Sequence, residues 1–309
     1  MSFKIHTGIF LAAMAACGVA QAQSSVTLYG KVDLGLQRAI GSSDTHMATG
    51  GDSRIGVRGV EDLGGGLKAF FGFEQRIHAT TGAIDGDGYK GYTHVGLQGG
   101  FGKVGLGRQY VAAFSLVQNQ IDPFEGDTVA QVRDVGMRFG GITKVRVNSS
   151  IRYDHKFGPV NVAASIADKD TNGNGPDRPM SLAANWKNGP LFLAAGWENP
   201  SGDKDYAWNL GAAYDISAAT VSLGFGRGKT DAGSSARGLV LGLNVPVGAG
   251  VIKAAYGTNK VGGVTGAQKV GLGYHYFMSK RTMLYVDVAH DNKAAKNKSG
   301  MDFGIRHTF

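Results

Sequence analysis

The chain has 309 residues, including 50 glycines, 7 prolines and 1 cysteine, and its formal net charge is +8 with a pI near 9.4. This glycine content is about twice the usual ~7%, which argues against a helix-rich fold, and the absence of a Gly-X-Y period excludes collagen. Few prolines and evenly spread aromatic residues argue against disorder, and the lone Cys17 leaves no disulfide framework.

The N-terminal segment is typical of a secretory signal peptide. Lys4 precedes an uncharged apolar stretch over residues 8–19, and Ala20-Gln21-Ala22 supplies the small-residue cleavage pattern. A membrane-spanning helix needs about 20 apolar residues, so this stretch is too short to be an anchor. We therefore expect a signal peptide over residues 1–22 and one exported domain over residues 23–309.

Apolar and polar residues alternate from Val26 onwards. Over 26–37 the even positions are mostly apolar and the odd ones mostly polar, a period of two that predicts a strand with one apolar face. The alternation recurs over 67–74, 144–154, 160–166, 180–186, 191–197, 208–214, 221–225, 239–245, 252–256, 270–276, 284–288 and 301–309, with shorter runs near 55, 95 and 104. Together these segments predict 16 strands.

The connections between the predicted strands alternate in length. Short turns lie at 61–66, 99–102, 156–159, 188–190, 217–219, 246–250 and 279–281. Longer polar stretches lie near 40–52, 78–88, 110–142, 168–178, 199–205, 228–236, 258–266 and 291–299. Short turns at one rim and long loops at the other are typical of an all-β, up-and-down antiparallel transmembrane barrel.

Charge indicates which face of the strands meets water. The basic side chains on the polar faces are Lys31, Arg54, Arg58, Lys68, Arg76, Lys103, Lys144, Arg146, Arg152, Lys169, Lys187, Lys253, Lys269 and Arg306, and the acidic ones are Asp33, Glu74, Asp154, Glu198, Asp287 and Asp302. A soluble sandwich could expose these charges to solvent as its outer face. A barrel in a bilayer would enclose them, and at 16 strands its interior is too wide for side chains to fill. The export signal and the aromatic residues near the strand ends favour the barrel.

The segment over residues 110–142 is too long for an ordinary connection, so it is either functional or exposed surface. It contains the acidic residues Asp122, Glu125 and Asp127 after a more apolar start. If the loop folds into the lumen, these acids face the basic wall and create a transverse field that sorts ions by charge. If it lies outside, its acids merely meet water.

Several motifs point to one family. They are SVTLYG (25–30), SRIGVRGVEDLGGGLKA (53–69), VGLQGGFG (95–102), LGRQ (106–109), NSSIRY (148–153), SKRT (279–282) and GIRHTF (304–309). These stretches resemble neisserial-type general porins of β-proteobacteria. The resemblance implies a homotrimer of 16-stranded pores with the third loop folded into each lumen. It implies that Arg54 and Arg152 belong to the basic wall of the constriction and Asp122 to its loop, and that the barrel assembly machinery reads Phe309.

Other chemistry is poorly supported. Residues 168–173 echo the start of a calcium loop, but position 12 of that loop is Pro179 instead of Glu. The 8 His residues have no metal-site spacing, and no nucleophile elbow is present. The basic residues alternate along strands and do not form a patch for nucleic acid. We therefore expect neither an enzyme nor a bound cofactor or metal.

The sequence predicts passive diffusion of ions and small hydrophilic solutes, with a preference for anions, through a barrel in the bacterial outer membrane. The expected basic wall comprises Lys31, Arg54, Arg58, Arg76, Arg146 and Arg152. A barrel in that membrane would also contact its lipid and lipopolysaccharide. Two alternatives stay open, namely a substrate-specific channel with a discrete lumen site and a barrel that acts as an adhesin.

Overall fold

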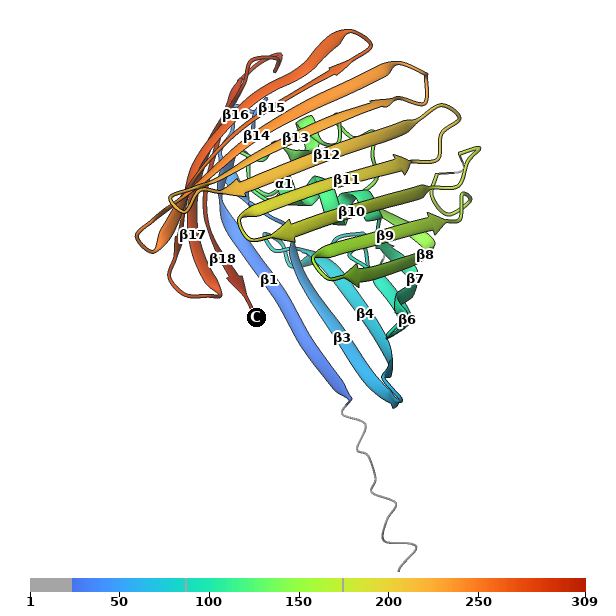
Figure 1. Cartoon of the computed structure of the whole chain (residues 1–309). Helices are drawn as coiled ribbons and strands as arrows, with labels where there is room; N and C mark the ends of the chain where they lie inside the picture. The colour runs from blue at the N-terminus through green and yellow to red at the C-terminus, as the bar shows by residue number, and fades with distance from the viewer. Residues whose placement is uncertain (1–23, 87, 174) are drawn as a thin grey trace, which may run out of the picture.

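The computed structural model describes residues 24–86, 88–173 and 175–309, so the expected signal peptide over residues 1–22 lies outside the described residues. The described chain winds into a closed antiparallel barrel (Figure 1). Its strands are β1 (Ser25–Arg38), β2 (His46–Ala48), β3 (Ser53–Gly64), β4 (Leu67–His78), β5 (Ala83–Ile84), β6 (Thr93–Gly99), β7 (Gly102–Tyr110), β8 (Arg146–Phe157), β9 (Val160–Ala167), β10 (Met180–Asn188), β11 (Leu191–Asn199), β12 (Tyr206–Asp215), β13 (Thr220–Lys229), β14 (Ser235–Val247), β15 (Gly250–Val261), β16 (Val264–Phe277), β17 (Thr282–Asp291) and β18 (Ser299–Thr308).

Sixteen of these strands, counted over the described residues, form the wall. The short strands β2 and β5 lie within the connections after β1 and β4 and only extend the sheet locally. Each wall strand pairs with its neighbour along the chain, and β1 closes the ring because it pairs with β3 through Lys31↔Arg54 and with β18 through Lys31↔Thr308. A closed ring leaves no sheet edge, which is what a strand structure needs in hydrocarbon. The predicted 16-stranded antiparallel barrel is confirmed.

The connections follow the predicted alternation with one correction. Residues 258–266 were expected to form a long polar loop, but β15 runs to Val261 and β16 begins at Val264. Gly262 and Gly263 have φ angles of 56° and 85°, which is the positive-φ pair that a two-residue hairpin turn requires. The polar residues on either side continue the strands beyond the apolar band, so their polarity does not indicate a loop.

Apolar side chains cover the outside of the wall. Leu28, Leu182 and Phe303 are 59%, 58% and 55% exposed, whereas polar residues in the alternate positions are shielded within the barrel. Trp186 and Tyr214 face outward near the short turns, and Trp197 and Trp208 face outward near the long loops. Two aromatic belts that flank an apolar band are typical of a barrel in a bilayer.

The long segment between β7 and β8 lies inside the barrel, which favours the lumen alternative over an exposed loop. It contains the π-helical segment η1 (Phe114–Gln118) and the short helices α1 (Asn119–Ile121) and α2 (Arg133–Gly136) (Figure 1). We call residues 111–145 the lumen loop. Its apolar side chains form the main buried hydrophobic cluster against the inner face of the wall, so the core of this protein lies in the lumen. None of the helices in the described ranges is long and apolar enough to cross a membrane.

Candidate functional site: the pore beside the lumen loop

Glycines on one side of the barrel make room for the lumen loop. An added Cβ atom at Gly211 would collide with Ile121, and one at Gly257 would collide with Val132. An added Cβ atom at Gly238 would collide with the backbone of Gly136. These inward positions lie on β12, β14 and β15, so the loop rests against this side of the wall. The opposite side, from β1 to β8, faces the remaining open lumen.

Polar wall residues hold the backbone of the loop. Asn185 Nδ2 donates to the Leu116 carbonyl at 3.1 Å, and Ser222 Oγ donates to the Ile121 carbonyl at 2.7 Å. Further bonds of this kind come from Asn209 to Met137, from Lys253 to Pro123 and from Asn259 to Val135, at 2.9, 2.7 and 3.2 Å. Because buried carbonyl groups need partners, these side chains fix the position of the loop.

The carboxylate of Asp122 faces the interior of the loop. Asp122 is 4% exposed, and its two oxygens accept hydrogen bonds from four backbone N–H groups at 3.0–3.1 Å. The donors are Phe124, Gly126, Val132 and Arg133. Its negative charge is therefore surrounded by the loop's own backbone and is withheld from the open lumen.

The other acids of the loop are placed differently. Glu125 is exposed at the tip, in the left-handed region with φ 57°. Asp127 Oδ2 lies 3.1 Å from Lys31 Nζ and 2.8 Å from Arg306 Nη2, so two cations of the wall flank it. Deeper in the loop, burial alone would raise the pKa of Asp134, but the guanidiniums of Arg133 and Arg138 at 3.1 Å hold that pKa below its ordinary value.

Three cations lie directly opposite one another on the side of the wall that faces the loop tip. Lys31 on β1 is the register partner of Arg54 on β3, which in turn pairs with Arg76 on β4. We call these three residues the basic row. Glu74 lies 3.6 Å from Arg54 and 3.1 Å from Arg76, so one carboxylate serves two guanidiniums. Arg76 also lies 3.3 Å from Asp52, so each cation of the row has a carboxylate partner, and Arg54, with 31% of its side chain exposed, is the member most open to the lumen.

The remaining predicted cations lie beyond the basic row. Arg58 follows Arg54 on the inner face of β3, is exposed, and stacks its guanidinium 5.1 Å from the ring centroid of Tyr29. Arg146 hydrogen-bonds the Tyr110 hydroxyl and lies 4.1 Å from the centroid of its ring. Arg152 binds Asp154 through both carboxylate oxygens, which neutralises much of its charge.

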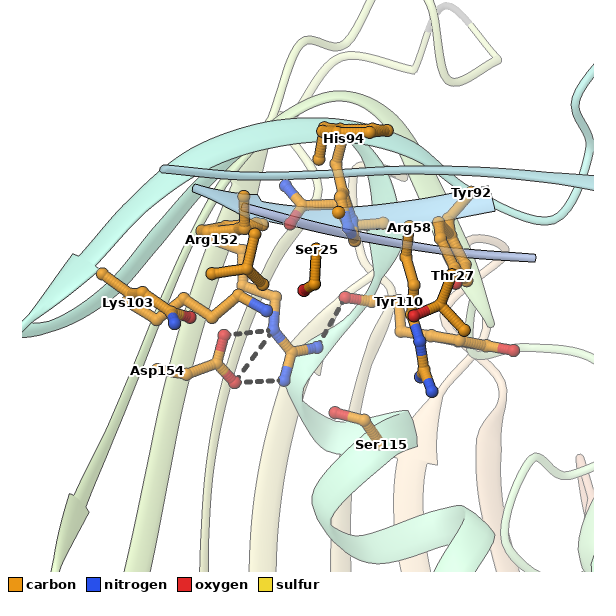
Figure 2. A pocket seen from close by; sticks show the side chains of 16 residues that line it. Ser25, Thr27, Arg58, Tyr92, His94, Lys103, Tyr110, Ser115, Arg152 and Asp154 are labelled. Carbon is orange, nitrogen blue, oxygen red and sulfur yellow. Dashed lines mark hydrogen bonds and ion pairs between the residues drawn. The ribbon is translucent and has the colours of Figure 1, made fainter. Parts of the chain in front are cut away.

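Arg58 and Arg152 line one hollow of the open lumen, and Arg146 is outside its lining. This cavity of about 590 Å³ is bounded by β1, β3, β4, β6, β7, β8 and the start of the lumen loop. Figure 2 shows the cavity, with Arg152 held by Asp154 and by the carbonyl oxygen of Tyr110 at 2.8 Å. Its lining also includes Lys103, so cations outnumber the one carboxylate that reaches it. The cavity is open and carries charged groups, as a path for hydrated ions requires.

Phe309, the predicted assembly signal, lies where β18 meets β1 and closes the barrel. The backbone of Phe309 exchanges two hydrogen bonds with Gly30, at 2.9 and 3.1 Å, and its side chain is 43% exposed. The C-terminal residue thereby extends the pairing of β18 with β1. Its ring remains accessible from outside the chain.

Sequence reasoning did not identify Arg306 as a partner of the loop. Arg306 Nε lies 2.7 Å from Asp33 Oδ2, and Tyr285 donates to Asp33 Oδ1 at 2.7 Å. All three residues lie on inward positions, but nothing in the alternation indicates that they meet or that Arg306 also reaches Asp127. The inward glycines on adjacent strands were the available sequence signal for where the lumen loop packs.

No group of three or more His, Cys, Asp or Glu side chains within residues 24–86, 88–173 and 175–309 could hold a metal ion. The described lumen offers charged walls and an open path. This arrangement can bind ions briefly and sort them by charge.

Comparisons with known proteins agree with this geometry. A family model described as "Gram-negative porin" matches residues 10–296. Outer membrane porin protein 32 of Delftia acidovorans is 33% identical, with 97% of this chain and 99% of the relative covered. A Bordetella pertussis outer membrane porin is 26% identical over 94% of this chain and 96% of its own. Among solved structures, the anion-selective porin from Comamonas acidovorans aligns with a TM-score of 0.79 at 29% identity, over 93% of this chain and all of the other. The trimer form of OmpT from Vibrio cholerae has a TM-score of 0.73 at 15% identity and covers 93% of this chain.

Proposed function

This chain belongs to the Gram-negative porin family, and from that membership we propose that its pore prefers anions and that the basic row sets the preference. The protein is a general diffusion porin of the bacterial outer membrane and is not an enzyme. Ions and small hydrophilic solutes cross through its water-filled lumen without turnover. The proposal concerns which of them pass more readily, and which residues decide it.

The observation that carries the proposal is the gathering of cations on one side of the open lumen, from the basic row to the exposed Arg58. Lys31, Arg54 and Arg76 lie opposite one another on adjacent strands. Glu74 lies between the two arginines, and Asp52 is a second partner of Arg76. In the loop that faces them, Glu125 is the exposed acid. The Asp122 carboxylate is enclosed by backbone N–H groups, and Asp127 is flanked by Lys31 and Arg306.

An ion that passes this region would therefore meet a net positive potential. A charged wall beside a low-dielectric body focuses that potential and raises the local concentration of counter-ions. We expect Arg58 to extend the field beyond the basic row, and Arg146 and Arg152 to contribute less because aromatic and carboxylate partners hold them. Glu125, exposed at the loop tip, would temper the preference. The Comamonas porin described as anion-selective supports the same direction.

Planar-bilayer recording tests the proposal. The purified, folded protein is inserted into a neutral bilayer with a KCl gradient, and the reversal potential of the single-channel current is measured. A reversal potential on the anion side is expected, and it should fall as salt rises because screening shortens to about 3 Å at 1 M. A potential on the cation side would contradict the anion preference. A folded barrel that does not conduct would contradict the open lumen.

Three partners are part of the same proposal. We expect a homotrimer, the state named for the Vibrio porin that shares the fold. We expect the barrel assembly machinery to read Phe309, whose ring is accessible at the seam between β18 and β1. We also expect the outer surface of the barrel to contact outer-membrane lipid and lipopolysaccharide.

A further inference from the structure

Three cations break the apolar outer face of the barrel on neighbouring strands. Arg227 on β13, Arg237 on β14 and Lys260 on β15 take outward positions that continue the rows of Phe225 and Leu239. Arg227 is the register partner of Arg237, and Arg237 is the register partner of Lys260. Figure 1 shows the three strands side by side. We call these three residues the outer triad.

The aromatic belt indicates the position of the outer triad along the membrane normal. Arg227 is the register partner of Trp208, whose ring lies 6.3 Å from that of Trp197 in the belt near the long loops. Trp residues gather at the membrane–water interface. The long loops mark the extracellular rim of such a barrel. The outer triad therefore lies at the level of the headgroups of the outer leaflet.

The triad is electrostatically uncompensated by the protein. Neighbouring strands are about 4.8 Å apart, so the three cations span only about 10 Å across the wall. In the part of the chain that the structure describes, none of the three forms an ion pair with a carboxylate. The nearby loop acid Asp231 accepts a hydrogen bond from the backbone N–H of Asp203 at 2.7 Å. Like charges opposite one another in a sheet are destabilising. A bound external anion would relieve this repulsion.

The surface around the triad is hollowed. A cavity of about 420 Å³ is lined by all three cations together with Phe225, Ser235 and Ala236 and by Gly263. Its floor therefore combines cationic groups with an aromatic ring that is 44% exposed. Below it, the apolar band continues through exposed Leu223 and Leu241. A ligand that fits must carry negative charge at its head and hydrocarbon beneath.

We propose that the outer triad is a docking site for the phosphorylated glucosamine headgroup of an outer-leaflet glycolipid, the lipid A part of lipopolysaccharide. The two guanidiniums can each donate two parallel hydrogen bonds to a phosphate, and Lys260 adds a point charge. The acyl chains lie against Phe225 and the leucines of the apolar band. This site deepens the expected contact with lipopolysaccharide and rests on the location of the barrel in the outer membrane, independently of the ion preference of the pore.

The test is lipid binding to the folded full-length protein in a zwitterionic detergent. A fluorescent lipid A with two phosphates is titrated against the wild type, against Arg227→Ala/Arg237→Ala and against Lys280→Ala/Arg281→Ala. The second double variant removes the same charge from the turn at the opposite rim. Two further measurements use a dephosphorylated lipid A as the ligand and inorganic phosphate as a competitor. Near a membrane surface each basic residue contributes about 1 kcal/mol, so removing two should weaken binding by roughly 30-fold.

We expect the wild type and the control variant to bind alike, the dephosphorylated lipid to bind poorly, and millimolar inorganic phosphate not to displace lipid A. Equal binding of lipid A by the wild type and the Arg227→Ala/Arg237→Ala variant would overturn the proposal. Displacement by inorganic phosphate would overturn it too, because the surface would then be a general anion patch. If the double variant does not fold, the comparison of the two lipids on the wild type decides. The reversal potential should be unchanged in the folded variant. A failure of the lipid-site proposal can therefore be told apart from a failure of the proposed anion preference.

Discussion

The carboxylate of Asp122 accepts a hydrogen bond of 3.0 Å from the backbone N–H of Arg133, eleven residues further along the lumen loop. The same carboxylate binds the N–H groups of Phe124 and Gly126 in the tight turn that follows it. One buried side chain thus joins the tip of the loop to its returning arm. The acid that the sequence placed at the constriction has a geometry suited to organising the loop that narrows the pore.

Replacing Asp122 by Ala should loosen the loop. The change leaves four N–H groups without this acceptor, two of them buried, and each buried loss costs about 1–3 kcal/mol. We expect open-channel current noise and frequent subconductance steps, with the barrel still folded by circular dichroism. Glu125→Gln is the matched control, because it alters an exposed acid of the same loop. A quiet Asp122→Ala channel with wild-type conductance would show that the wall alone holds the loop.

Replacing Asp127 by Asn should increase the preference for anions. Asp127 lies 3.1 Å from Lys31 and 2.8 Å from Arg306, so its removal leaves two wall cations without this partner. The expected result is a reversal potential displaced further toward that of chloride, by more than in Asp62→Asn, which removes an acid near the short-turn rim. A displacement in the cation direction would be incompatible with the proposed field.

Replacing Gly238 by Ala should displace the loop. An added Cβ atom would overlap the Gly136 carbonyl oxygen, and backbone yields less readily than a flexible side chain. We expect a thermal midpoint several degrees lower and an altered single-channel conductance, since overpacking costs typically about 1–3 kcal/mol. Gly100→Ala is the control, because an added Cβ atom there meets open space. Wild-type stability and conductance in Gly238→Ala would contradict close packing of the lumen loop against the wall at that position.

Replacing Phe309 by Ala should reduce the yield of assembled barrel in cells without changing the channels that do assemble. The backbone hydrogen bonds of Phe309 to Gly30 do not need its ring, and the ring is available to a partner. The measurement compares the amount of folded, heat-modifiable protein in outer-membrane fractions with the conductance of purified channels. Thr308→Ala provides a neighbouring control. Equal yields of folded protein from the two variants would remove the ring from the assembly signal.

The alternation of residues predicts the fold because a strand that separates lipid from water has a period of two. The row from Val26 to Leu36 is apolar on the even positions, and those large side chains face outward as expected. The same rule fails at residues 258–266, where the strands extend beyond the apolar band and carry Lys260 outside and Asn259 inside. Outside hydrocarbon, only the Gly262-Gly263 pair marks the turn.

The site was harder to predict, because its contacts join residues far apart in sequence. Inward position alone places Arg54 and Arg76 on the wall, but their register decides that they lie opposite each other. The direction of the Asp122 carboxylate depends on the fold of the loop, which has no alternation to reveal it. The outer triad is visible in sequence only as charges at the ends of apolar rows, and its three members meet through pairing between strands.

The most direct test of the charge-based account is the reversal potential of Arg54→Ala/Arg58→Ala in a KCl gradient. Both side chains are at least partly exposed on the inner face of β3. The control Lys68→Ala/Lys156→Ala removes the same charge from another hollow of the lumen, toward the short turns. We predict that the first variant loses most of its anion preference and that the control keeps it. Equal reversal potentials for the wild type and both variants would contradict the account.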